Sequence, residues 1–357
     1  MEFPEELTLC LKKVSEPRYG ENPQQDAAIY EVEFSKLLPI TRAKQLNGKP
    51  MSFNNWLDAD GVLKMLWQFE NPFATVFKHV TPAGACESDD ILDAYKRAWE
   101  CDPLSAFGGV AGINRPLTKE LAEYAIDKKF LEVIIAPKVE DDALEVLSQK
   151  KNLRVLEIDT RMPSDPGWDV RQVTGGFLIQ EFDYTELKPD DLIYLEDRGI
   201  KKPTEEQIED MLFGWKVNRR TRSNTVILVK DKATIGIGSG QQNRVDAALI
   251  ACYRANKPYG KFEKKECGSS LQELADYVGF RMRGRTQGSV AVSSAFYPFP
   301  DTIEVLHAFG VEASLSPAGS IRDEETYEAL RKYDMAAAHT PYVERGGYRG
   351  GMRAFLH

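Results

Sequence analysis

Residues 74–84 read Ala74-Thr75-Val76-Phe77-Lys78-His79-Val80-Thr81-Pro82-Ala83-Gly84, so that an apolar segment runs directly into a basic pair and then into a turn. The β-branched and aromatic residues before Lys78 predict a strand, and the proline and glycine after it predict a turn. Lys78 and His79 are therefore expected at a strand end, where α/β folds place side chains that face ligands. An imidazole beside an ammonium group can move a proton while the ammonium balances developing negative charge. The commoner role of a histidine, which is to satisfy local hydrogen bonds, stays open on this segment alone.

Strand-like and helix-like segments alternate along the chain, which predicts an α/β fold with helices covering a sheet. One helix is expected after the capping residues 88–90, and another after the capping-box pattern of residues 204–207, Thr-Glu-Glu-Gln. Short β-branched runs bounded by turn residues predict strands at 132–136, 225–229 and 289–292.

The chain length of 357 residues exceeds one typical hydrophobic core and predicts about two domains. A charged stretch lies between Phe182 and Thr204, and its composition marks a boundary between subdomains. The two predicted units are residues 1–190 and residues 191–357.

Composition excludes several classes of protein. No apolar run approaches the roughly 20 residues that would span a bilayer, and the net charge of −9 argues against a sequence-independent nucleic-acid binder. The acidic start, residues 1–6, has no basic region followed by an apolar core, so no secretory signal or transit peptide is visible and the cytoplasm is the expected location. The cysteines are widely spaced and form no C-x-x-C, which predicts neither a disulfide framework nor a zinc cage. They are Cys10, Cys86, Cys101, Cys252 and Cys267.

Two basic clusters run against the acidic charge of the chain, at residues 219–222 and 281–285. A solvated face is the simplest interpretation of each cluster. The alternative is that one of them steers an anionic small molecule through its local field.

A glycine-rich turn follows the strand predicted at 225–229 and reads Gly236-Ile237-Gly238-Ser239-Gly240-Gln241-Gln242-Asn243-Arg244. Its spacing, G-x-G-x-G, is not the dinucleotide fingerprint, and the chain has no G-x-x-x-x-G-K-[ST] phosphate loop, so neither NAD nor ATP is supported. Arg244 stands at the start of the next predicted helix, where a cation is unfavourable unless an anion lies close by. The position therefore predicts a contact between Arg244 and an anion.

Three further runs are candidates for ligand contact. Residues 18–25, Arg-Tyr-Gly-Glu-Asn-Pro-Gln-Gln, combine an arginine fork with an aromatic ring, although the run alone could be any surface loop. Residues 295–301, Ala-Phe-Tyr-Pro-Phe-Pro-Asp, could form the wall of a flat pocket, although core packing is the commoner explanation. The last residues, 352–357, are expected to dock on the protein.

Taken together, these runs resemble one family: the formyltransferase half of the bifunctional purine-biosynthesis enzyme. That half formylates aminoimidazole carboxamide ribonucleotide (AICAR) from 10-formyltetrahydrofolate. The matching motifs, in order, are R-Y-G-x-N-P-x-Q at 18–25, K-H-x-x-P-x-G at 78–84, D-x-x-S-x-F-G at 102–108, S-N at 223–224, G-x-G-x-G-Q-x-x-R at 236–244, A-F-F-P-F-x-D at 295–301 and G-S at 319–320.

The resemblance implies a tandem of two cytidine-deaminase-like α/β/α units without the deaminase zinc. The chain agrees on the zinc, because His79 is followed by Val80-Thr81 rather than x-Glu, and no P-C-x-x-C occurs. The resemblance also implies a homodimer whose active sites lie at the subunit interface. Relatives usually carry a fused cyclohydrolase domain, so a separate IMP cyclohydrolase is expected to close the purine ring, and neither a nucleic acid nor a membrane is an expected partner.

The resemblance further assigns roles to individual residues. His79 matches the general base, Lys78 the group that stabilises the oxyanion, and Asn224 the residue that orients the AICAR carboxamide or imidazole. Residues that match nucleotide-contacting positions are Arg18, Tyr19, Gly108, Glu132, Arg244, Phe296 and Arg353. Residues that match positions contacting the folate cosubstrate are Val245, Asp301, Ser320 and Ile321.

The chain departs from the family pattern at three places. Ser293-Ser294 stands where many relatives have Ser-Asp, and the lost carboxylate weakens the case for a bound potassium ion. Glu132 stands where some relatives have aspartate, which retains the charge with a longer reach. Residues 341–351 lengthen the path to Arg353, and this insertion could be an interface loop, a lid or an inert surface loop.

Other classes of function stay open at this level. A nucleotide-binding regulator would bind AICAR without turning it over. A metal-dependent nucleotide deaminase would share the fold and would contain stoichiometric zinc. A ligase using ATP and formate is a more distant alternative, because the chain has no recognisable phosphate loop.

Overall fold

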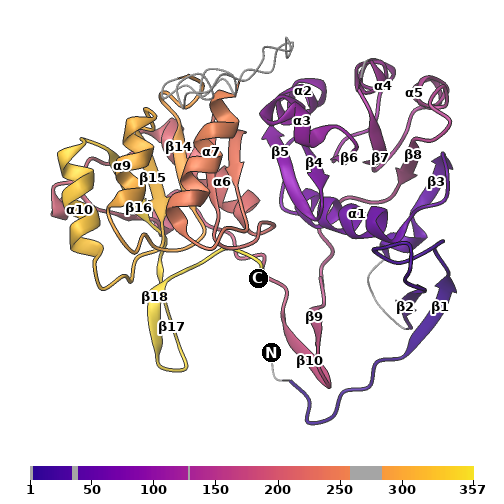
Figure 1. Ribbon diagram of the computed structural model, residues 1–357, viewed down its shortest axis with the longest axis horizontal. Coiled ribbons are helices and arrows are strands. Elements are labelled where there is room, and N and C mark those ends of the chain that lie inside the picture. The colour runs from indigo at the N-terminus through magenta and orange to yellow at the C-terminus, as the bar shows by residue number, and fades with distance from the viewer. Residues whose placement is uncertain (1–2, 34–38, 128, 258–283) are drawn as a thin grey trace, which may run out of the picture.

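The central strands carry apolar side chains on both faces, as a sheet covered on both sides requires. On β4 (Phe73–Lys78), Phe73 and Phe77 pack in the same core as α1 (Phe53–Leu66), whereas Ala74 and Val76 pack in the core that contains α2 (Ile91–Cys101). Figure 1 shows α1 on one side of this half of the molecule and α2, α4 and α5 on the other. The computed structural model describes residues 3–33, 39–127, 129–257 and 284–357.

In the described part of the chain, twelve strands form one mixed sheet in the order β11-β16-β15-β14-β12-β13-β5-β4-β6-β7-β8-β3. Besides β4, these strands are β3 (Lys44–Asn47), β5 (Thr81–Glu87), β6 (Gly109–Ile113), β7 (Leu131–Ala136), β8 (Arg154–Glu157), β11 (Ile193–Tyr194), β12 (Val226–Lys230), β13 (Ala233–Gly238), β14 (Val290–Ser293), β15 (Ala313–Ser316) and β16 (Ala336–His339). The remaining described helices are α3 (Pro103–Ala106), α4 (Lys119–Ile126), α5 (Asp141–Leu147), α6 (Glu205–Asn218), α7 (Arg244–Asn256), α9 (Asp301–Ala308) and α10 (Asp323–Lys332).

The sheet consists of two halves in which equivalent strands follow the same order from the outer edge to the middle. From one edge it runs β3-β8-β7-β6-β4-β5, and from the other β11-β16-β15-β14-β12-β13. Each half places a helix, an antiparallel strand pair and a second helix before three parallel strands joined by helices. The predicted α/β fold is confirmed.

The two halves of the sheet meet where β5 and β13 run antiparallel, with Ala233 opposite Cys86. The hydroxyl oxygen of the buried Thr234 accepts the backbone N–H of Ala85 at 2.9 Å, and it donates to the Ala85 carbonyl oxygen at 3.2 Å. The Glu87 backbone N–H donates to the Lys232 carbonyl oxygen at 2.9 Å. These bonds make one continuous sheet from the two halves.

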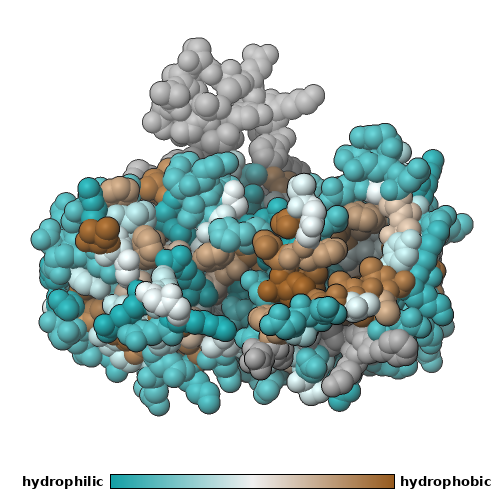
Figure 2. Space-filling model, turned by 90° about the horizontal axis from the view of Figure 1, so that it is seen from below, coloured by the Kyte–Doolittle hydropathy of each residue, from teal (hydrophilic) through white to brown (hydrophobic). Residues whose placement is uncertain are grey.

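Among the described residues, three two-stranded antiparallel sheets lie outside the main sheet. They are β1 (Leu11–Ser15) with β2 (Ile29–Val32), β9 (Trp168–Val173) with β10 (Gly176–Glu181), and β17 (Tyr342–Arg345) with β18 (Tyr348–Gly351). The β9–β10 and β17–β18 hairpins both extend towards the side on which α1 lies (Figure 1). Viewed from that side, apolar surface gathers between the centre and the right of the molecule (Figure 2).

Most local predictions agree with these elements. The helices predicted after residues 90 and 204 are α2 and α6, capped by Asp90 and by the Thr204–Gln207 capping box. The three predicted strands are β7, β12 and β14. Among the described residues, no helix is long and apolar enough to cross a membrane.

The prediction of solvated basic clusters is wrong for Arg219 and Arg220, which are only 4% and 7% exposed. Both follow directly on α6, whose apolar side chains pack in the core, and this packing carries the two arginines into the interior. Residues 281–283 of the second cluster lie outside the described residues, as does Cys267. Among the described residues, the other four cysteines form no disulfide.

Candidate active site

The register of the sheet brings predicted site residues from both halves to one row of strand ends. We call this row the site edge. Lys78 ends β4, and Gly108 precedes β6. The two residues reach the same edge because Phe77 of β4 pairs with Val110 of β6. In the second half, β13 runs antiparallel to β5, so the turn after β13 that leads to Arg244 lies at the edge where β4 ends. Asn224 reaches the same edge because Val226 of β12 pairs with Gly238 of β13.

His79 and Val80 form the two-residue turn between β4 and β5. Their φ values are 55° and 59°, and this left-handed conformation is unfavourable for a β-branched residue such as Val80. The buried Asp58 of α1 holds the turn, because its Oδ1 accepts the Val80 N–H at 2.5 Å. The His79 side chain itself is exposed.

Asp58 is a supporting residue that the sequence analysis missed. Burial raises the pKa of its carboxyl group, while hydrogen bonds from the backbone N–H groups of Val80 and His79 act in the opposite direction. The signal in the sequence was a carboxylate at helical spacing from two residues that the structure buries on α1, three positions after Asn55 and four before Val62. Buried carboxylates are rare unless they are paired or hydrogen-bonded.

Lys78 and Gly108 lie close together. The Lys78 Nζ donates to the Phe107 carbonyl oxygen at 2.6 Å, and a Cβ at Gly108 would lie 3.8 Å from that nitrogen. Gly108 has a φ of +75°, and its N–H donates to the Phe130 carbonyl oxygen at 2.7 Å. The rings of Phe107 and Phe130 lie 5.4 Å apart, and both side chains are exposed beside the ammonium group.

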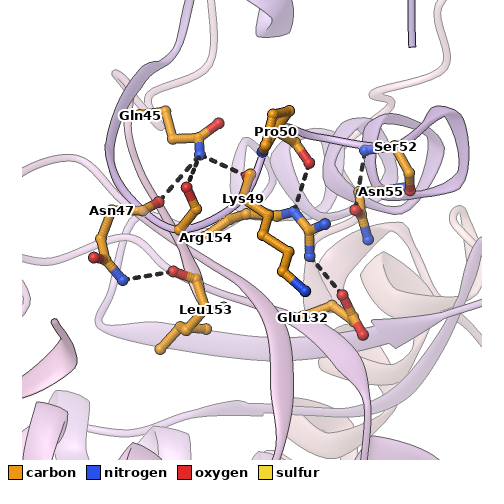
Figure 3. Close-up of polar contacts among 10 residues, drawn as sticks. Gln45, Asn47, Lys49, Pro50, Ser52, Asn55, Glu132, Leu153 and Arg154 are labelled. Carbon is orange, nitrogen blue, oxygen red and sulfur yellow. Dashed lines mark hydrogen bonds and ion pairs between the residues drawn. The ribbon is translucent and has the colours of Figure 1, made fainter. Parts of the chain in front are cut away.

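Glu132 is oriented by an arginine that the sequence analysis did not single out. The Arg154 Nη1 contacts the Glu132 Oε2 at 2.6 Å, and the Arg154 Nε donates to the Pro50 carbonyl oxygen at 3.1 Å (Figure 3). The loop around Pro50 is itself held by Asn47, whose Nδ2 donates to the Leu153 carbonyl oxygen at 2.8 Å. The carboxylate of Glu132 is thus fixed near the start of β7.

A cavity of about 390 Å³ opens beside this part of the edge. Its walls include the apolar side chains of Phe130, Leu131 and Leu153 and the basic Lys150 and Lys151. The cavity therefore suits a ligand with an apolar body and a negative charge.

Arg244, the first residue of α7, turns its guanidinium back into the protein and is 6% exposed. Its Nη1 donates to the Ser294 Oγ at 2.7 Å and to the Thr225 carbonyl oxygen at 3.1 Å. Its Nε is buried without a hydrogen-bond partner among the described residues. Burial lowers the pKa of Arg244 to about 10; Tyr297 acts in the opposite direction, and the positive charge of Arg353 acts in the same direction.

Arg353 lies within cation–π distance of two aromatic rings. Its guanidinium carbon is 5.3 Å from the ring centre of Phe296 and 5.5 Å from that of Tyr348. Arg353 thus lies beside Phe296, and its charge acts on Arg244. The partners given above for the two guanidinium groups are neutral, so none of them balances this pair of positive charges.

Asn224 is held at the start of β12 by the turn after β13. Its side-chain Nδ2 donates to the Gln241 carbonyl oxygen at 2.9 Å, and the backbone groups of the two residues exchange two further bonds. The peptide bond between Ser223 and Asn224 is cis. Val245, a predicted folate contact, is half-buried next to Arg244.

The other predicted folate contacts lie on the second half. Asp301 begins α9, and its Oδ1 accepts the Thr302 N–H at 2.7 Å. The Ser320 N–H donates to the Asp323 Oδ1 at 3.2 Å, in a loop that leaves Ile321 fully exposed. This loop contacts the β17–β18 hairpin, since a Cβ at Gly319 would lie 3.5 Å from the Gly350 Cα.

Arg18 and Tyr19 are not brought to Lys78 by any described contact. They lie between β1 and β2, where Arg18 is exposed and Tyr19 half-buried. The run they begin reaches α1 through Asn54, whose Nδ2 donates to the Glu21 carbonyl oxygen at 3.2 Å. Within the described ranges, no group of three or more His, Cys, Asp or Glu side chains could hold a metal ion.

Comparison with known proteins gives one family. The model of the AICARFT/IMPCHase bienzyme family matches residues 1–254. The bifunctional purine biosynthesis protein PurH of Acetivibrio thermocellus is 39% identical over 100% of this chain and 62% of its own length. PurH of Caldicellulosiruptor saccharolyticus is 38% identical over 99% of this chain and 61% of its own. The chain therefore spans less than two thirds of these relatives.

Proposed function

Because the chain belongs to the AICARFT/IMPCHase bienzyme family, we propose that it transfers a formyl group from 10-formyltetrahydrofolate to the 5-amino group of AICAR, in the biosynthesis of purines. One observation carries the proposal. A lysine at the end of β4 and a histidine on the hydrogen-bonded turn that follows it share one sheet edge with a buried arginine, whose positive charge its described partners do not balance.

The Arg244 and Arg353 pair suits the phosphate of AICAR. Two guanidinium groups repel each other, and a dianion between them would replace that repulsion with charge-assisted hydrogen bonds. The Phe296 ring beside Arg353 offers an apolar face on which a flat heterocycle can stack.

Lys78 and His79 suit the chemical step. The amine nitrogen attacks the formyl carbon and loses a proton, the carbonyl oxygen becomes an oxyanion, and the bond to the folate nitrogen then breaks. The exposed imidazole of His79 would accept the amine proton. The Lys78 ammonium uses one N–H on the Phe107 carbonyl oxygen, which leaves two for the oxyanion and for the departing nitrogen.

We also propose a homodimer with active sites at the interface between subunits. An isolated two-stranded ribbon is marginally stable in water, and β10 exposes Phe177 and Leu178 at 56% and 63%. A second subunit covering this hairpin would remove that apolar surface from water. The mirrored strand order supports the further proposal of two cytidine-deaminase-like units, residues 1–190 and 191–357, around one sheet.

The first experiment measures formation of tetrahydrofolate by the purified protein with AICAR and 10-formyltetrahydrofolate, with and without added IMP cyclohydrolase. We expect turnover by wild type, a loss of about a hundredfold or more in kcat for His79→Ala, and a rise of about tenfold to a hundredfold in the KM for AICAR for Arg244→Ala. His307→Ala is the matched control, because His307 of α9 stacks on Tyr333 rather than reaching the site edge.

Two outcomes would overturn the proposed transferase activity and indicate another function. Tight binding of AICAR without any transfer would indicate a regulator that keeps the pocket without the chemistry. Stoichiometric zinc together with release of ammonia would indicate a deaminase.

A further inference from the structure

The insertion at residues 341–351 forms the β17–β18 hairpin, whose two ends meet at the site edge. The turn at its tip is Gly346-Gly347, with φ values of 57° and 82°. At its base, the Met352 N–H donates to the Pro341 carbonyl oxygen at 2.8 Å, and the Thr340 hydroxyl donates to the Met352 carbonyl oxygen at 2.7 Å. The hairpin is therefore an ordered element fixed beside Arg353.

The base of the hairpin also docks on the loop that carries Ser320. The Gly351 N–H donates to the Ala318 carbonyl oxygen at 2.9 Å. A Cβ at Gly351 would lie only 2.4 Å from the Ala318 nitrogen, so this approach requires glycine. The insertion is thus joined to a predicted folate-binding loop as well as to Arg353.

A second glycine directs the ring of Tyr348. A Cβ at Gly350 would lie 2.4 Å from the Tyr348 Oη and 2.7 Å from its Cζ, so the ring folds back over Gly350 into the space that a side chain would fill. The folded ring reaches Arg353, whose guanidinium carbon is 5.5 Å from the ring centre. Phe296 lies 5.3 Å from the same carbon.

We propose that Tyr348 is a positioning residue, which holds the Arg353 guanidinium against Phe296 in the orientation that binds the anionic group of the substrate. This inference rests on the proposed function. A free arginine samples many rotamers, and a guanidinium held by two rings loses less freedom when it binds an anion. The ring faces attract the cation without neutralising it, so Arg353 keeps its full charge for the ligand.

The ring rather than the hydroxyl performs this role, because attraction between a cation and an aromatic face needs no hydrogen bond. Tyr348→Phe should therefore behave as wild type. Tyr342 supplies the control within the same hairpin, because it has a similar exposure and its ring faces Arg349, at 5.8 Å, rather than Arg353.

The experiment compares Tyr348→Ala, Tyr348→Phe, Gly350→Ala and Tyr342→Ala with wild type. It measures kcat and the KM for AICAR at saturating folate, the dissociation constants of AICAR and inorganic phosphate by calorimetry, and the melting temperature. We expect Tyr348→Ala and Gly350→Ala to raise KM and both dissociation constants about tenfold with kcat within about twofold. Tyr348→Phe and Tyr342→Ala should match wild type.

A double variant sharpens the test. Gly350→Ala should have no further effect in the Tyr348→Ala background, because the ring that the new Cβ would displace is already gone. Unchanged KM in Tyr348→Ala overturns the inference, and so does an equal effect of Tyr342→Ala, which would show that the hairpin acts only as structure.

The proposed function can fail separately. Wild type that binds AICAR without turnover would remove the transferase proposal, and the calorimetric comparison would still decide the role of Tyr348. Wild type that binds neither AICAR nor phosphate would overturn both.

Discussion

Asp210 shows how burial changes the chemistry of one residue. It lies on α6 at 7% exposure, where its carboxylate accepts the Asp231 N–H at 3.1 Å and the Lys232 N–H at 2.7 Å. Burial raises its pKa from the ordinary value of 3.8 to about 6, and the two hydrogen bonds act in the opposite direction. The interior therefore favours the protonated form over the charged form at pH values where an exposed aspartate is ionised.

This raised pKa predicts a pH dependence of stability. Below about pH 4 Asp210 is protonated in both states, and as pH rises towards 6 the folded state binds more protons than the unfolded state. The free energy of unfolding of wild type, relative to that of Asp210→Asn, should therefore fall by about 2 kcal/mol between about pH 4 and pH 7. Urea unfolding at several pH values measures it, and a constant or rising difference would contradict the sign.

The helices α1 and α6 occupy equivalent places in the two halves, and each supports a turn of different sequence. Asp58 and Asp210 are each the sixth residue of a 14-residue helix, and each accepts backbone N–H groups from a left-handed two-residue turn. The second turn, Asp231-Lys232, has φ values of 52° and 53°. The first turn follows Lys78 and contains His79. Both halves therefore have an aspartate that supports a turn, whereas only the first half has the residues proposed for formyl transfer.

Alanine variants of the two aspartates should separate stability from activity. Asp58→Ala and Asp210→Ala each leave partly buried turn N–H groups without their acceptor, which should lower the free energy of unfolding by about 2 kcal/mol. Only Asp58→Ala should also lower kcat, by about tenfold or more, because only that turn positions Lys78 and His79. Denaturant titration and steady-state kinetics on both variants test this, and an equal loss of kcat in both would refute it.

At the scale of the whole molecule, one sheet edge collects two groups of residues from distant parts of the chain. The first half supplies Lys78, His79 and Gly108, and the second supplies Asn224 and Arg244. The β9–β10 and β17–β18 hairpins extend from the same side of the molecule (Figure 1). Exposed apolar surface on that side is the feature that a second subunit would cover.

The proposed dimer can be tested through the β9–β10 hairpin. We expect wild type to sediment as a dimer, and the double variant Phe177→Asp/Leu178→Asp to sediment as a monomer with little formyl transfer, because two buried carboxylates would be costly at an interface. Leu249→Asp on α7 is the control, since it places a charge on the outer helical layer. A monomeric wild type with full activity would exclude interface active sites.

Local patterns determined the α/β class, the first residues of α2 and α6, and the placement of Lys78 and His79 at a strand end. These features depend on hydrogen bonds within a few residues, such as the Thr204–Gln207 capping box, and such bonds leave their signature in the neighbouring sequence. The resemblance of ordered motifs then predicted which residues form the site.

Only the tertiary structure decided which distant residues meet. The support of His79 by Asp58, the pairing of Glu132 with Arg154 and the stacking of Tyr348 on Arg353 join residues from separate elements. The burial of Arg219, which the sequence placed on a solvated face, likewise depends on how α6 packs. Strand register and helix packing determine these contacts. Register and packing depend on covering both faces of a long sheet at once, and no local sequence pattern specifies them.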